Sequence, residues 1–166
     1  MVYKGFFDVR VDLLSLRHGP KKHYAFLEMG CHAALVLAET PDGKLVINQE
    51  YRHPTKQWLL SCPGGRIDGG ESPIDAAQRE LLEETGYTAK EWIYLGACYP
   101  QPAVSDQQLH YILAKHATLA TAPQREEFEV IHTVLKTPEE LMRDIRSGHK
   151  VDGILCTALF LRTLHI

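Results

Sequence analysis

The chain has 166 residues, of which 45% are hydrophobic and 23% are charged, and its formal net charge is −3. This is an ordinary globular composition, which excludes a disordered or collagen-like chain. The acidic balance argues against a general nucleic-acid binder, whose domain is usually basic. No apolar run reaches the roughly 18–20 residues that span a bilayer, and the first residues lack the apolar segment of a signal peptide. We therefore expect one cytoplasmic domain over residues 1–166, with no nucleic-acid or membrane partner.

The cysteines and histidines give no sign of a disulfide framework or a zinc site. The four cysteines lie far apart, at positions 31, 62, 98 and 156, and a chain of this size needs no disulfides to stabilise its core. None of the nine histidines has the spacing of a zinc ligand set. We expect reduced thiols and histidines that lie on the surface or form hydrogen bonds.

Hydrophobic periodicity and turn residues predict a mixture of strands and helices. A hairpin is expected in residues 1–28, because two loosely alternating segments are separated at His18-Gly19-Pro20. Further strands are expected at 31–38, 44–52, 58–62, 91–99, 109–115 and 128–135. Helices are expected at 73–85, from 138 to about 146, and from about 152 onward, with a glycine-rich loop at 63–70. Because strands and helices do not alternate regularly, the class is α+β, an α/β/α sandwich with a mixed sheet flanked by helices.

The predicted helix at 73–85 carries three glutamates on one face. Glu80, Glu83 and Glu84 are spaced i, i+3 and i+4, so their like charges repel one another. Such a cluster of carboxylates provides the hard oxygen ligands that Mg²⁺ or Mn²⁺ prefers. Arg79 lies four residues before Glu83 and can pair with it, which leaves the other two glutamates for a metal. The alternative is a solvated acidic face, but the glycines that flank this helix favour a metal site.

The pattern around this helix resembles the Nudix box. The matching residues are Gly65, Glu71, Arg79-Glu80-Leu81, Glu83-Glu84 and Gly86-Tyr87, at the spacing of that motif. The resemblance implies the Nudix fold and a hydrolase that acts on a diphosphate. It also implies structural roles for Gly65, Glu71, Arg79 and Gly86.

The resemblance extends beyond the box to the branch of ADP-ribose and nucleoside-diphosphate-sugar pyrophosphatases. Residues 49–52 and 58–65 resemble that branch, and Pro102 lies fifteen residues after Tyr87, as its marker proline does. Residues 99–106 also resemble the branch, although Ala103 stands where glycine is usual. The implied reaction is hydrolysis of ADP-ribose to AMP and ribose 5-phosphate. The alternatives are GDP-mannose or another sugar nucleotide as substrate, and a nucleotide-binding module without catalysis. A third alternative, hydrolysis of nucleoside triphosphates or RNA 5′ ends, is disfavoured by Pro102 and residues 51–52.

The resemblance assigns metal ligands and a base. Glu80, Glu84 and the carbonyl of Gly64 would bind Mg²⁺ or Mn²⁺, and Glu83 would contribute to catalysis. A loop glutamate outside the box activates water in related enzymes, and Glu126 or Glu127 lies in the corresponding region. Two adjacent glutamates are equally typical of a solvated loop.

Further residues are candidates for binding the substrate. Arg52 presents a planar guanidinium that can hold two phosphate oxygens, although it could instead pair with a carboxylate. Tyr51, Ser105 and Pro102 lie in segments that resemble the branch, and Phe7 is a candidate for stacking on the base, as is Trp58. Several enzymes of this branch are dimers that exchange N-terminal strands, so we expect a homodimer in which residues 1–30 take part.

Overall fold

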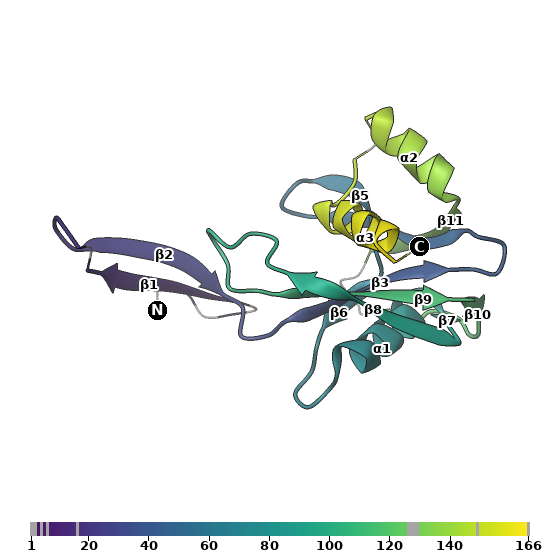
Figure 1. The fold of residues 1–166 in the computed structure, drawn as a ribbon, viewed down its shortest axis with the longest axis horizontal. Helices are drawn as coiled ribbons and strands as arrows, with labels where there is room; N and C mark the ends of the chain where they lie inside the picture. Colours follow the sequence, from purple (N-terminus) through teal and green to yellow (C-terminus); the bar gives the residue numbers. More distant parts are fainter. Residues whose placement is uncertain are drawn as a thin grey trace.

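The computed structural model describes residues 3, 5, 7–15, 17–125, 130–148 and 150–165. Its centre is a seven-stranded mixed sheet with the order β11-β4-β3-β9-β8, to which β5 adds beside β4 and β6 beside β3. Only the β3–β9 pair of this sheet is parallel, and the other described pairs are antiparallel. Helix α1 lies on one side of the sheet, and α2 and α3 lie on the other (Figure 1). The predicted α+β class with helices flanking a mixed sheet is confirmed.

The elements follow the predicted order closely. The longer strands are β1 Asp8–Leu14, β2 Lys22–Glu28, β3 Ala33–Glu39, β4 Leu45–Arg52, β5 Gln57–Ser61, β8 Glu91–Cys98, β9 Leu109–Lys115 and β11 Ile131–Lys136. The short strands are β6 Gly64–Arg66, β7 Tyr87–Thr88 and β10 Thr118–Leu119. The helices are α1 Pro73–Thr85, α2 Pro138–Arg146 and α3 Gly153–Thr163.

Strand β3 divides the core into two layers, because its successive side chains point to opposite faces of the sheet. Ala34 and Val36 belong to the cluster that packs on α1, whereas Leu35 and Leu37 belong to the cluster that packs on α3. All four are buried, which is why this strand is a continuous apolar run. The sheet therefore holds α1 at a fixed position against its centre.

Local capping residues determine where helix α1 begins and ends. The Ser72 hydroxyl accepts a hydrogen bond from the Asp75 amide at 3.2 Å, and Pro73 occupies the first turn. Gly86 ends the helix in the left-handed conformation, with φ of 76°, and its amide donates to the Leu82 carbonyl. The predicted bounds of 73–85 are confirmed, and the box glutamates therefore lie on the last two turns.

The β1–β2 hairpin projects away from the sheet (Figure 1). It contacts the rest of the chain at the turn before β9, where the Leu27 amide donates to the Val104 carbonyl at 2.8 Å. The Tyr24 hydroxyl donates to the Ala103 carbonyl at 2.6 Å. The hairpin predicted for residues 1–28 is confirmed, and it is joined to the body by few contacts.

Two parts of the structure differ from the sequence prediction. Part of the expected glycine-rich loop is strand β6, because its residues pair antiparallel with Ala33–Leu35 of β3. Strands β7 and β10 were not predicted either. Each has only two residues, which is too few to show an alternation of apolar and polar side chains. Within the described part of the chain, no helix is both long enough and apolar enough to cross a membrane.

Candidate active site

A polar cavity of about 270 Å³ lies at the C-terminal half of α1. We call it the carboxylate pocket, and its lining residues are Glu50, Arg52, Gly64, Gly65, Arg66, Arg79, Glu80, Glu83, Glu84 and Gln124. The three glutamates expected to bind metal thus lie in one pocket, together with both predicted glycines and Arg52. They come from α1, β4 and β6; α1 packs on β6, and β4 and β6 both pair with β3.

Glu84 is the most deeply buried of these glutamates, at 5% exposure. Its Oε2 accepts a hydrogen bond from the Asn48 side-chain amide and another from the Gly64 backbone amide, both at 2.9 Å. Gly64 has φ of 150°, and a Cβ there would overlap the Ala34 carbonyl, so only glycine fits this close approach. The fold thereby holds one oxygen of Glu84 in a fixed orientation.

Arg79 lies among the other carboxylates. Its guanidinium bonds both oxygens of Glu71, at 3.0 and 3.1 Å. It also contacts Glu80 at 2.7 Å and Glu83 at 3.2 Å. The hydrogen bonding that Arg79 donates to Glu71 is the largest cause that raises the pKa of Arg79, and the same interaction lowers the pKa of Glu71. The spacing of the sequence predicted a pair between Arg79 and Glu83. In the structure Arg79 also contacts Glu80, the next residue of the helix.

The donor set of the carboxylate pocket fits a divalent metal. Gly65 has no side chain, and a Cβ there would overlap the Glu80 carboxylate, so the glycine leaves the space that this group occupies. The buried Oδ1 of Asn48 has no hydrogen-bond partner among the described residues. Within the described ranges, however, no three Asp, Glu, His or Cys side chains are arranged to hold a metal. Glu80 lies 2.7 Å from Arg79, so a metal that binds Glu80 would compete with this contact.

Residues 124 and 125, which follow β10, form hydrogen bonds with the C-terminal end of α1. The Gln124 amide donates to the Glu83 carbonyl at 2.7 Å, and Arg125 Nε donates to the Glu84 carbonyl at 2.8 Å. The candidate bases Glu126 and Glu127 follow directly in the sequence but lie outside the described residues. Their assignment stays a prediction.

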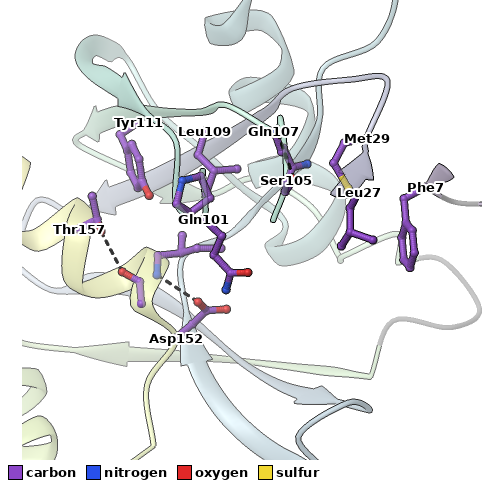
Figure 2. A pocket seen from close by; sticks show the side chains of 13 residues that line it. Phe7, Leu27, Met29, Gln101, Ser105, Gln107, Leu109, Tyr111, Asp152 and Thr157 are labelled. Carbon is purple, nitrogen blue, oxygen red and sulfur yellow. Dashed lines mark hydrogen bonds between the residues drawn. The ribbon is translucent and has the colours of Figure 1, made fainter. Parts of the chain in front are cut away.

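A second and larger cavity of about 580 Å³ lies between the start of α3, the 100–107 segment and the end of the hairpin (Figure 2). We call it the α3 cavity. Its apolar lining residues are Phe7, Leu27, Met29, Pro100, Leu109, Tyr111 and Ile154. The others are Gln101, Ser105, Gln107, Asp152, Gly153 and Thr157. Its volume lies in the range of small-molecule sites.

Arg52 connects the two cavities. It lines the carboxylate pocket, and its guanidinium lies 2.6 Å from Glu50 and 3.9 Å from the carboxylate of Asp152, which lines the α3 cavity. Arg52 thus has carboxylate partners, as one interpretation of the sequence expected, and it also lies in the pocket, as expected of a residue that binds phosphate.

The remaining predicted substrate residues are distributed unevenly. Phe7 and Ser105 line the α3 cavity, whereas Pro102 lies with Ser105 beside the hairpin in a third, apolar cavity. Tyr51 is not among the described lining residues of the carboxylate pocket or the α3 cavity, and its ring meets Trp58 edge-on at 5.9 Å. Trp58 also stacks on His132 at 5.0 Å. These two aromatic residues therefore contact each other rather than either cavity.

Sequence reasoning missed Asn48 and the position of Asp152. Asn48 follows the apolar run 45–47 of β4 and precedes the polar residues Gln49 and Glu50, so nothing in the sequence marks it as the buried one of these polar residues. Asp152 was noted as the start of a helix, but its place between the cavities depends on tertiary packing.

Comparisons with known proteins agree with this geometry. A model of the NUDIX domain matches residues 31–152. The ADP-ribose pyrophosphatase of Bacillus subtilis (strain 168) is 33% identical over 122 residues, which are 73% of this chain and 66% of that protein. The methanol dehydrogenase activator of Bacillus methanolicus is 30% identical over 122 residues, with the same two shares of 73% and 66%. The chain thus spans just under two thirds of the length of these relatives.

Two further proteins extend the comparison. The ADP compounds hydrolase NudE of Escherichia coli (strain K12) is 28% identical over 109 residues, which are 66% of this chain and 59% of that protein. A crystal structure of an ADP compounds hydrolase matches with a TM-score of 0.86 over 98% of this chain and 88% of that one, at 23% identity, which shows a common fold. The box, the fold and the domain match together establish that this chain belongs to the NUDIX family.

Proposed function

We propose that the protein is a metal-dependent hydrolase that cleaves the diphosphate of ADP-ribose, or of a related nucleoside diphosphate sugar, into two monophosphates. ADP-ribose would give AMP and ribose 5-phosphate. The observation that carries this proposal is the ion pair between Arg52, which lines the carboxylate pocket, and Asp152, which lines the larger α3 cavity, because it places the two cavities side by side. One cavity suits a diphosphate and its counterions, and the other suits a nucleoside or sugar. The similarity to an ADP-ribose pyrophosphatase of Bacillus subtilis and an ADP compounds hydrolase of Escherichia coli supports the same substrate class.

The carboxylate pocket would hold Mg²⁺, with Mn²⁺ as the alternative, through Glu80 and Glu84, and through the Gly64 carbonyl predicted from the family resemblance. When bound, a divalent ion supplies the positive charge that allows an acidic pocket to accept a diphosphate. Asn48 and the Gly64 amide orient Glu84, and Arg79 holds Glu71 in place. Glu83 is 46% exposed at its side chain, so it can accept a proton or contribute to the ligand set.

The other groups bind the substrate and activate water. Arg52 faces the pocket from β4 and can donate two hydrogen bonds to phosphate oxygens. Glu126 or Glu127 would accept the proton of the attacking water. Supporting this, the preceding residue, Arg125, is tied to the backbone of Glu84. Water would attack phosphorus, so hydrolysis in ¹⁸O-labelled water should place the label in one phosphate product. A label on the sugar hydroxyl would overturn this chemistry.

A panel of substrates tests the proposal. Phosphate release after coupling to a phosphatase would be measured for ADP-ribose, ADP-glucose, GDP-mannose, diadenosine polyphosphates and dGTP. We expect ADP-ribose to give the highest kcat/KM, and GDP-mannose is the alternative. Activity on dGTP alone would refute the proposal. Complete inactivity with tight nucleotide binding would favour the module without catalysis, which the intact set of box glutamates disfavours.

The variant Glu84→Gln tests the carboxylate pocket, with Glu139→Gln as its control. Glu139 is an exposed glutamate in the first turn of α2. Glu84→Gln keeps the size of the side chain but removes its charge, so turnover should fall by about 100-fold or more, whereas Glu139→Gln should retain full turnover. Equal activity of the two variants, or full activity in excess EDTA, would show that this pocket binds no essential metal.

We also propose a homodimer formed through the β1–β2 hairpin. One face of the hairpin is apolar. Val9 pairs with Leu27 and Val11 with Ala25, and Leu13 follows on the same face because alternate residues of a strand point the same way. Leu13 is 53% exposed, and an isolated two-stranded hairpin is marginally stable in water. A second copy would cover this face. We further propose that residues 1–166 act as one domain in the cytoplasm, and the four free cysteines agree with a reducing compartment.

A further inference from the structure

The α3 cavity has an unusual charge distribution for a site that would accept part of a nucleotide. Among the described residues that line it, Asp152 is the one charged side chain, and none is Lys, Arg or His. A site that binds a terminal phosphate normally supplies Arg, Lys or free backbone amides. The described lining of the cavity therefore offers no cationic side chain to a phosphorylated end.

The start of α3 is not available to an anion either. Asp152 is the N-cap of α3, and its Oδ1 accepts a hydrogen bond from the Ile154 amide at 3.0 Å. The nearest described cation, Arg52, lies 3.9 Å from Asp152 but 2.6 Å from Glu50. A carboxylate thus already occupies the end of the helix that would attract a phosphate.

Neutral hydrogen-bonding groups lie near this carboxylate. The Gln101 side chain points toward Asp152, and Ser105 and Thr157 line the same cavity (Figure 2). On the hairpin side the wall is apolar, with Phe7 and Leu27. An apolar wall suits one face of a ring, whereas a carboxylate and an amide accept hydrogen bonds from hydroxyl groups.

We infer that the α3 cavity binds an uncharged, hydroxyl-bearing end of the substrate, and that Asp152 excludes substrates on which that end carries a phosphate. This inference rests on the proposed function, because it identifies which diphosphate compounds the enzyme would accept. Asp152 is a specificity-determining residue here, since its charge would lie against any phosphate placed on those hydroxyls.

The test compares ADP-ribose with two analogues, one phosphorylated on the ribose of adenosine and the other on the terminal ribose. For the end that occupies the α3 cavity, Asp152→Asn should raise the ratio of kcat/KM for the phosphorylated analogue to kcat/KM for ADP-ribose by about tenfold or more. Asparagine is also a good N-cap, so the variant should keep α3 intact, and Asp152→Ser provides a second neutral cap. Asp42→Asn, in the exposed β3–β4 turn, removes the same charge elsewhere and should leave the ratio unchanged. A change below threefold for both analogues in both cap variants would overturn the inference.

A binding experiment separates this inference from the proposed function. Calorimetry would compare adenosine with adenosine 2′-phosphate, and ribose with ribose 1-phosphate, and it needs no turnover. We expect one uncharged member to bind the native protein at least about tenfold more tightly than its phosphorylated partner, with this preference lost in Asp152→Asn. Equal binding within both pairs would overturn the inference even if ADP-ribose is hydrolysed. Failure to hydrolyse any substrate, with the preference present, would refute only the proposed function.

Discussion

The buried amide of Asn48 should contribute to both stability and catalysis, and Asn48→Ala separates the two effects. The substitution removes the hydrogen bond that Asn48 donates to Glu84 and leaves the bond from the Gly64 amide. Asn48 is 1% exposed, so water cannot easily replace the lost donor.

The magnitude follows from the kind of bond that is lost. A hydrogen bond to a charged group contributes about 1.5–3 kcal/mol, and the lost packing of the side chain raises the expected loss to about 2–4 kcal/mol. For a chain of this size each kcal/mol lowers Tm by about 2–4 °C, so Tm should fall by about 5–15 °C. Outer residues that orient a metal ligand typically contribute about 10–100-fold to activity, and kcat should fall by that factor.

The assays are thermal unfolding in EDTA, which reports the protein alone, and steady-state hydrolysis of ADP-ribose with saturating Mg²⁺. Ser61→Ala is the matched control, because Ser61 pairs with Asn48 across β4 and β5 and is also 1% exposed. Its hydroxyl oxygen has no hydrogen-bond partner among the described residues, so its removal should change Tm by less than about 3 °C. Equal Tm losses in the two variants would refute the reasoning on stability, and unchanged kcat in Asn48→Ala would refute the orienting role.

Three further predictions concern other parts of the chain. Glu71→Gln should lower Tm by about 2–4 °C at neutral pH. Arg79 lowers the pKa of Glu71 in the folded protein below 4.5, so this stabilisation is present above pH 4.5 and is lost as the pH falls through the folded pKa. The Tm values of the two proteins should therefore converge in acid. A difference in Tm that persists in acid would contradict this prediction. Gly65→Ala should reduce kcat at least about tenfold but change Tm by less than about 3 °C, because the new methyl displaces only the flexible end of Glu80; a large loss of Tm with normal kcat would contradict this. Leu13→Glu should convert a dimer to a monomer in light scattering at micromolar concentration, and a native protein that is already monomeric would refute the dimer.

Local signals in the sequence were sufficient for the helices. The bounds of α1 are correct because Ser72 and Gly86 cap it with groups from its own flanks. The same holds for α2, where Thr137 and Glu140 form a reciprocal capping box. The box motif is long, and its glutamates on α1 line one pocket together with Gly64 and Gly65.

Tertiary contacts account for what the sequence did not predict. The bond between Asn48 and Glu84 joins residues that are 36 positions apart, and no periodic pattern encodes it. Strand β6 was expected as a loop, because glycines disfavour strands and only pairing with β3 makes Gly64–Arg66 extended. The sequence likewise gave no indication that Arg79 would contact Glu80 as well as Glu83, since side-chain directions depend on the surrounding carboxylates.

The central parallel pair has a consequence for how the chain folds during synthesis. Ala33 of β3 pairs in register with Leu109 of β9, so the middle of the sheet cannot form until about eighty further residues have been made. At about 5–20 residues per second, the edge of β3 that pairs with β9 stays open for several seconds. The β1–β2 hairpin can dock only at a similar stage, because the Leu27 amide donates its hydrogen bond to the Val104 carbonyl. We therefore expect the hairpin to dock only after residues 101–106 have been made, and β3, whose edge toward β9 stays open until then, to be a segment that needs chaperone protection on the ribosome.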